Sequence, residues 1–261
     1  MLFVVIIVGI GLVILIVLAA RARAEQERRR ISALWAWAQS NGFAFSKDDP
    51  ADLATRFEGI GDIGRGHSRY AFEVLSRTDP APVFMFRYHF ATTETRTVTS
   101  TDSQGNTTTH TETYEEDHWR AYLIAEIGSA FPGLMIRPEH WGDKVAGFLG
   151  FDDIDFESED FSSRYLVKSA DKQFAYAVIH PQMMEWLLPQ HLTIGLEKGC
   201  VVLSLDPSQN EPANWHAAWT TAAGFINRIP PFVWQDYGKR QRVELPLTKP
   251  PRPVEPVQRE S

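Results

Sequence analysis

Val83-Phe-Met-Phe-Arg-Tyr-His-Phe90 and Trp119-Arg-Ala-Tyr-Leu-Ile-Ala-Glu-Ile127 are two segments rich in aromatic and apolar residues, and a threonine-rich segment separates them. Aromatic residues, β-branched residues and threonine favour strands, whereas Ser103-Gln104-Gly105-Asn106 at the centre favours a turn. The sequence therefore predicts a long antiparallel β-hairpin. Its tip is polar on both faces and is expected to extend beyond the sheet, where strand register is weakly specified.

The rest of the body alternates short strands with short helices. Leu192–Glu197 and Cys200–Leu205 are predicted to pair as a second hairpin around Lys198-Gly199. Apolar residues at helical spacing predict a final amphipathic helix over Pro212–Arg228. We therefore predict an α+β fold, in which an antiparallel sheet with a long β-hairpin packs against several helices. A barrel resembling pleckstrin-homology domains shares this order of elements, but only as an analogy.

The first twenty residues predict a membrane anchor. Met1 to Ala20 carries no charged side chain and is dominated by Val, Ile and Leu. A helix of about 20 such residues spans about 30 Å of hydrocarbon. A cleavable signal peptide is the alternative, because Ala22-Arg23-Ala24 resembles a cleavage site. That alternative lacks a basic n-region and has too long an apolar run. The sequence thus predicts a single N-terminal transmembrane helix.

Five arginines follow the apolar run, at Arg21, Arg23, Arg28, Arg29 and Arg30. Because positive charge flanks the cytoplasmic end of a membrane helix, we expect a single-pass protein of the cell membrane with a cytoplasmic body. The same arginines are candidates for contact with anionic headgroups at the membrane surface, so the bilayer is an expected partner.

Composition then divides the chain into four parts: a transmembrane anchor at 1–20, a basic juxtamembrane and stalk helix at 21–42, an α+β globular body at 43–238 and a disordered proline-rich tail at 239–261. The chain has a net charge of −7, and the body alone carries about −13. Such a body repels a phosphate backbone, so nucleic-acid binding is disfavoured. The tail contains P-x-x-P and is expected to act as a spacer or a docking segment.

An acidic run is the strongest candidate metal site. If the backbone around it is extended, Asp153, Asp155 and Glu157 share one face while Ile154 and Phe156 point into the core. Three carboxylates on one face suit a divalent cation such as Mg²⁺ or Ca²⁺. The competing interpretation is a solvated strand face followed by a capped helical turn.

Three further features of the sequence are less specific as candidate functional sites. His89 and His118 are expected to face each other across the long hairpin, as a metal or acid/base site or as a cross-strand polar pair. Gly59, Gly61 and Gly64 fit G-x-G-x-x-G, but the predicted helix precedes them and the strand follows, so we predict a flexible turn and no dinucleotide site. Cys200, the single cysteine, lies in an apolar run and is predicted to be a buried hydrophobic residue.

Several short segments resemble uncharacterised bacterial membrane-anchored proteins of unknown function. The likeness involves Phe156-Glu-Ser-Glu-Asp-Phe161, Asp171-x-x-Phe174-Ala175 and Pro181-x-Met183-Met184-Glu185-Trp186-Leu187-Leu188. Tyr165-x-Val167, Phe86-Arg-Tyr88 and Asn41-Gly42-Phe43 belong to the same resemblance. It implies a bacterial origin and one continuous domain, and it assigns no activity.

These observations favour a membrane-tethered protein-binding or scaffold module whose partner is another protein. The projecting hairpin and the lack of catalytic motifs in the sequence support this interpretation, and no catalytic residue is assigned. The alternative is a divalent-metal-dependent enzyme that uses the acidic strand around Asp153–Glu157. Small-ligand sensing is a third class. No cofactor other than that cation is expected.

Overall fold

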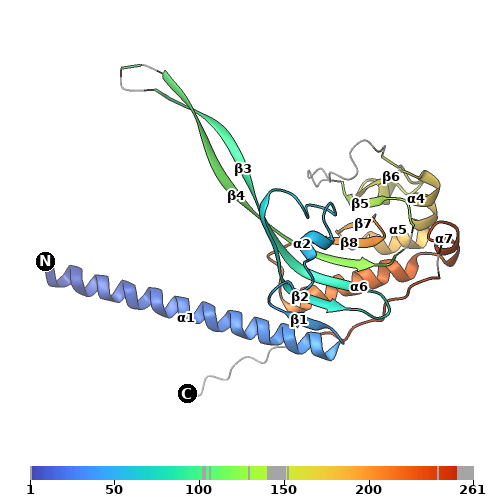
Figure 1. Cartoon of the computed structure of the whole chain (residues 1–261), viewed down its shortest axis with the longest axis horizontal. Helices are drawn as coiled ribbons and strands as arrows, with labels where there is room; N and C mark the ends of the chain where they lie inside the picture. The colour runs from blue at the N-terminus through green and yellow to red at the C-terminus, as the bar shows by residue number, and fades with distance from the viewer. Residues whose placement is uncertain are drawn as a thin grey trace.

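The computed structural model of the chain describes residues 2–101, 104–105, 107–128, 130–139, 151, 153–239 and 241–251, with side chains described from Ile10 onward. Its centre is an eight-stranded sheet in the order β1-β2-β3-β4-β8-β7-β5-β6 (Figure 1). Every pairing between neighbouring strands is antiparallel. The strands are β1 Ala44–Ser46, β2 His67–Arg77, β3 Val83–Thr101, β4 Thr107–Glu126, β5 Leu134–Pro138, β6 Tyr165–Ser169, β7 Thr193–Glu197 and β8 Cys200–Leu205.

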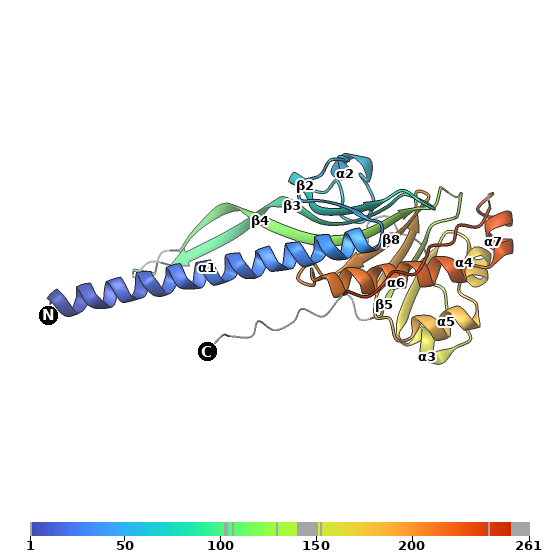
Figure 2. The ribbon, with the colours of Figure 1, turned by 90° about the horizontal axis from the view of Figure 1, so that it is seen from below.

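The helices are α1 Leu2–Ser40, α2 Leu53–Arg56, α3 Glu159–Ser162, α4 Lys172–Val178, α5 Pro181–Leu187, α6 Pro212–Arg228 and α7 Pro231–Asp236. Helix α6 packs across the sheet over β4 and β8, whereas α2 lies near β2 on the opposite face (Figure 2). The predicted α+β class is thus confirmed. The sequence also predicts a short strand and a short helix between Met135 and Gly150. Strand β5 falls at the start of this stretch, and residues 140–150 lie outside the described residues.

The long hairpin is confirmed and is the most extended part of the sheet. Strands β3 and β4 pair from Val83↔Ala125 to Thr101↔Thr107 without a shift of register. The outer half of this pair projects far beyond the other strands (Figure 1). We call the projecting part, residues 92–101 and 107–120, the ribbon.

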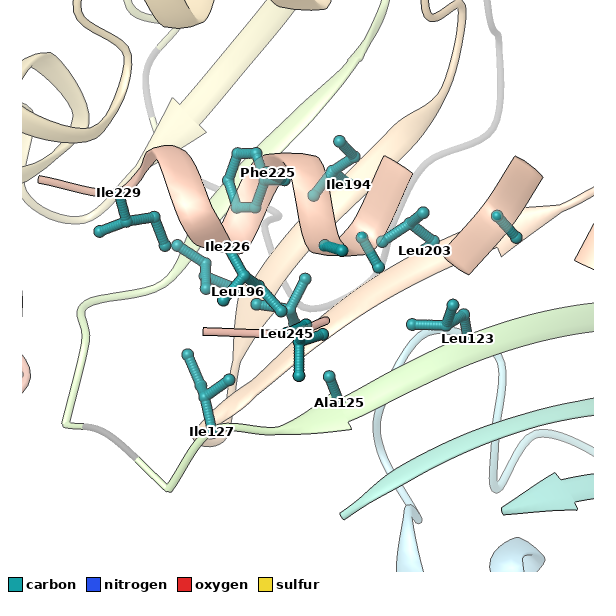
Figure 3. Packing of buried hydrophobic residues seen from close by; sticks show 14 of the residues in the cluster. Leu123, Ala125, Ile127, Ile194, Leu196, Leu203, Phe225, Ile226, Ile229 and Leu245 are labelled. Carbon is teal, nitrogen blue, oxygen red and sulfur yellow. The ribbon is translucent and has the colours of Figure 1, made fainter. Parts of the chain in front are cut away.

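The sheet has an apolar core on each face, because its strands alternate between two buried sides. The larger core contains Leu123, Leu203 and Leu196 from the sheet, and Phe225 and Ile226 from α6 pack against them (Figure 3). The smaller core lies on the other face and combines alternate residues of β3 with residues of α2 and of the glycine-containing loop after α2 (residues 57–66). Its members include Leu53, Phe57, Ile60, Ile63, Phe84, Phe86, Tyr88 and Phe90. Covering both faces makes the sheet a rigid base for the ribbon.

The predicted membrane anchor is contradicted. Among the described residues, no helix combines the length and the apolar character that crossing a bilayer requires. The predicted single-pass placement in the cell membrane is contradicted by the same finding. The predicted cytoplasmic orientation depended on that anchor.

The C-terminal part of α1 docks on the body. Leu34, Trp37 and Ala38 are buried against the larger core. Gly42 follows the helix with a positive φ of 73°, so the predicted end at Asn41-Gly42 is confirmed. The helical spacing of Ile31, Leu34, Trp35 and Ala38 in the sequence predicts that Trp35 lies on the docked face, yet it is 53% exposed. The buried stripe is centred on Leu34 and Trp37 instead.

Residues 241–251, which fall in the predicted disordered tail, run as an extended segment along α6 and reach α1. Val243 and Leu245 are buried in the larger core. The Trp219 indole donates to the carbonyl of Pro246 (2.8 Å), and the Trp37 indole donates to that of Lys249 (3.0 Å). This part of the chain therefore strengthens the fold, although its proline-rich composition predicts disorder.

Candidate partner-binding surface at the base of the ribbon

A cluster of partly exposed aromatic rings lies where the ribbon leaves the sheet. The His89 ring lies between Tyr70 and Trp119, with ring centroids 4.8 Å and 4.5 Å away. Phe72 meets the edge of Trp119 at 5.8 Å. Tyr70 is 46% exposed and Trp119 is 42% exposed. We call Tyr70, Phe72, His89 and Trp119 the hairpin-base cluster.

Strand pairing brings these four residues together. Tyr70 pairs with His89 across β2 and β3, and His89 pairs with Trp119 across β3 and β4. Directly paired residues in adjacent strands point to the same face, so three strands present their rings side by side. Arg87 lies over the Phe72 ring, with its guanidinium carbon 4.8 Å from the centroid. This cation–π contact holds Phe72 in place beside the cluster.

His89 is fixed through both ring nitrogens. Nδ1 lies 3.0 Å from the carbonyl oxygen of Ser68, and Nε2 lies 2.9 Å from a carboxylate oxygen of Asp117. Both partners are acceptors, so each contact is a hydrogen bond when the ring nitrogen that faces it carries the proton. The cluster is therefore held by polar contacts at its centre and leaves its outer rings open to solvent.

The predicted pairing of His89 with His118 is wrong. The register places His89 opposite Trp119 and His118 opposite Phe90, so the two histidines lie on opposite faces. His118 stacks on Phe90 at 4.7 Å, and its Nε2 lies 2.7 Å from the Thr92 hydroxyl. The register differs by one residue from the one that would pair the two histidines, and such a shift places their side chains on opposite faces of the sheet.

A groove continues the surface from Phe72 toward α1. It has a volume of about 570 Å³ and is open to solvent. Exposed Trp35 and partly buried Phe45 give it an apolar part, and Lys47 and Arg28 contribute positive charge. Its lining residues are Glu27, Arg28, Ile31, Ser32, Trp35, Phe45, Lys47, Phe72 and Glu73. Because Phe72 belongs to both, the groove and the hairpin-base cluster form one continuous surface.

A buried ion pair fixes α1 at this groove. The Arg30 guanidinium donates to both carboxylate oxygens of Glu73, at 2.6 Å and 3.0 Å. It also donates to Glu27 and to the carbonyl of Asn210 (3.1 Å). Burial by itself would lower the pKa of Arg30, but the hydrogen bonds to Glu27 and Glu73 raise it above its ordinary value. Arg30 was predicted at the membrane surface, whereas its side chain is only 6% exposed.

The other predicted arginines lie along the exposed part of α1. Arg29 pairs with Glu25 at 3.0 Å on the solvent side, and Arg28 lines the groove. Arg21 and Arg23 are exposed. Of the five, Arg28 lines the groove, and Arg30 is buried in its ion pair with Glu73.

The acidic strand does not gather its carboxylates around a common point. Ile154 is buried between exposed Asp153 and Asp155, so the predicted alternation of faces is confirmed. Asp153 pairs with Lys168 at 3.0 Å, and Glu157 is exposed. Within the described part of the chain, no three His, Cys, Asp or Glu side chains lie close enough to hold a metal ion. The metal site remains a prediction that no contact in the structure favours.

The glycine-containing loop after α2 packs on the sheet. The Tyr122 hydroxyl accepts from the amide of Asp62 (3.1 Å), and the Tyr88 hydroxyl accepts from that of Gly64 (3.2 Å). Burial raises the pKa of Tyr122, so its hydroxyl stays protonated. Gly61 adopts a positive φ of 55° directly against the Tyr122 ring. The loop is thus a fixed cover over the smaller core.

Cys200 is buried, as predicted. Burial raises the pKa of its thiol to about 12, so it is not a thiolate at neutral pH. This excludes an activated cysteine nucleophile at this position.

No family model matches the chain, and no curated protein matches it. A solved structure does: the crystal structure of the mycobacterial trehalose monomycolate transport factor A, TtfA. It superposes with a TM-score of 0.53 at 14% identity, covering 78% of this chain and 98% of that one. The likeness establishes a shared fold. At this identity it assigns no activity or ligand.

Sequence reasoning missed the hairpin-base cluster, although a signal for it was present. Tyr70 and Phe72 alternate along one strand, and Trp119 falls on the same face once the hairpin register is fixed. The register depends on the number of residues in the turn, which the sequence leaves open.

Proposed function

We propose that this chain is a protein-binding or scaffold module that docks a partner on the hairpin-base cluster and the adjoining groove. The observation that carries the proposal is the exposure of Tyr70 and Trp119 at 46% and 42% on a rigid sheet. Trp and Tyr are enriched among the residues that dominate protein interfaces, because they bury large area at low entropic cost.

The surroundings of these rings suit a protein partner. The groove beside them combines apolar walls with both signs of charge, from Glu27, Arg28 and Lys47. Interfaces of this kind have an apolar centre and a polar rim. The structural neighbour is described as a transport factor, and a role in holding a partner is in keeping with that description. The resemblance to uncharacterised bacterial proteins stays a prediction.

Site-specific photo-crosslinking of the full-length chain in its native cell tests the proposal. A photoreactive phenylalanine analogue is placed at Tyr70 or Trp119, with Phe232 as the matched control because it is 50% exposed on α7, away from the ribbon. We expect a discrete crosslinked protein from the first two positions and none from the third. Mass spectrometry of the crosslinked peptide then identifies the partner.

Binding of that purified partner gives the quantitative test. Trp119→Ala and Tyr70→Ala should each weaken binding by about 2 kcal/mol, whereas Phe232→Ala should leave it unchanged. Equal crosslinking from all three positions, or no discrete species from Tyr70 and Trp119, would overturn the proposal.

A further inference from the structure

Strand β4 has a long open edge. It pairs with β8 only over Ala121–Glu126, and β8 leaves the sheet after Leu205. Residues 107–120 of β4 therefore have β3 on one side and, within the described part of the chain, no strand on the other. Alternate backbone N–H and C=O groups along such an edge point outward and are free to pair with an added strand.

This edge lacks the prolines, lysines and bulges that often protect a free strand from pairing. Residues 107–126 contain no proline, glycine or lysine. The ladder between β3 and β4 runs without a bulge, whereas the ladder between β2 and β3 has two irregularities. Proteins normally interrupt exposed edges with prolines, bulges or lysines. A straight edge of this length is suited to receive a strand.

Charge selects which strand it receives. The ribbon carries five carboxylates and two arginines; Arg96 pairs with Glu112 at 2.9 Å, and Arg120 pairs with Asp62 at 2.6 Å. The carboxylates are Glu94, Glu112, Glu115, Glu116 and Asp117. A second copy would bring the same acidic edge, and like charges across a ladder are destabilising. A basic strand would instead place its cations opposite these groups.

We propose that the outer edge of β4, residues 107–120, binds a basic extended segment of a partner protein as an added antiparallel strand. The added strand continues the line of β8 past the point where Leu205 pairs with Ala121. Backbone hydrogen bonds supply the pairing, and Lys or Arg at alternate positions contact Glu115 and Asp117 on one face or Glu112 and Glu116 on the other. The inference rests on the proposed function, since it names the chemistry of the partner.

Peptide binding to the full-length chain tests the inference. The probe is a fluorescent peptide of about ten residues that alternates lysine with threonine, measured by anisotropy at low and high salt. A glutamate–threonine peptide tests the sign of the charge. A lysine–proline peptide keeps the charge but has lost half its backbone donors. We expect binding of the lysine–threonine peptide alone, with slower hydrogen exchange confined to residues 107–120.

Two matched variants locate the contact. Glu115→Gln with Glu116→Gln should weaken binding of the lysine–threonine peptide about fivefold. Glu157→Gln with Glu159→Gln removes the same charge from exposed residues at the start of α3, which lies away from the ribbon (Figure 2), and should have no effect. A thermal melt of each variant checks that the fold is retained.

Three results would overturn the inference: no binding of the lysine–threonine peptide, equal binding of the lysine–proline peptide, or exchange protection outside residues 107–120. If crosslinks from Trp119 still form in that case, a partner binds by another mode and the proposed function stands. Binding of the peptide without any crosslinks from Tyr70 or Trp119 would support the open edge and overturn the hairpin-base surface.

Discussion

The buried Arg30–Glu73 pair should stabilise the folded chain far more than the neighbouring exposed pair. The side chains of Arg30 and Glu73 are 6% and 9% exposed, so neither is solvated by bulk water. Removing one partner of a buried pair costs about 3–5 kcal/mol. Arg87 also lies 3.5 Å from Glu73, but it makes no second hydrogen bond to this carboxylate of the kind that Arg30 supplies. Arg30→Met removes the cation and keeps most of the apolar stem. We therefore expect the free energy of unfolding to fall by about 3–5 kcal/mol.

Arg29 supplies the control within the same turn of helix. It pairs with Glu25, and the two side chains are 55% and 54% exposed. An exposed pair of this kind contributes less than about 1 kcal/mol, so Arg29→Met should be nearly neutral. Both substitutions remove one positive charge from α1. Their difference therefore isolates the effect of burial.

Glu73→Gln completes a double-mutant cycle. Glu73 has a positive φ of 52°, and Gln inherits the same backbone, so backbone strain cancels in the comparison. We expect a coupling energy of about 2 kcal/mol between Arg30→Met and Glu73→Gln. The assay is equilibrium unfolding in urea, followed by tryptophan fluorescence, because the chain has 8 tryptophans. An Arg30→Met cost within about 1 kcal/mol of that of Arg29→Met, or strictly additive substitutions, would refute the reasoning.

Leu245→Ala should lower the free energy of unfolding by about 2–4 kcal/mol, whereas Leu247→Ala should leave it unchanged, because the two side chains are 2% and 77% exposed. Urea unfolding measures both variants, and equal effects would contradict the packing of residues 241–251. Native Cys200 should react with iodoacetamide far more slowly at pH 8 than the urea-unfolded chain, because its buried thiol has a pKa of about 12; equal rates by mass spectrometry would contradict this. Burial raises the pKa of Glu197 above its ordinary value, so this carboxyl holds its proton to higher pH in the folded chain than in the unfolded chain, and its contribution to stability should fall as pH rises above about 4.5. Glu197→Gln should flatten this fall in urea midpoints measured at successive pH values, and an unchanged pH profile would count against the assignment.

Local patterns predicted the elements well because each depends on a few neighbouring residues. The hairpin of β3 and β4, the shorter hairpin of β7 and β8, and helix α6 follow from strand-forming runs, a turn and an apolar helical stripe. Such signals lie within one segment. They require no knowledge of the distant residues that will pack against it.

Predictions that depended on distant partners fared worse. Nothing in the sequence distinguishes Arg30 from Arg28 and Arg29, because its partner Glu73 lies on another element. Val243 and Leu245 look like isolated apolar residues in a proline-rich tail until α6 offers them a surface. The hairpin-base cluster needs a register across three strands. In each case tertiary contact outweighs local composition.

The docking of α1 gives this helix the mechanics of a lever. It is held to the body from Arg30 onward, while Leu2 lies about 42 Å further along the helix axis. A rotation of about 5° about Arg30 would move that far end by about 4 Å. Because Glu27, Ile31 and Trp35 of α1 line the groove, a partner that wedges against Trp35 would swing the helix. A small displacement at the body then becomes a large one at a remote point, without any rearrangement of the sheet.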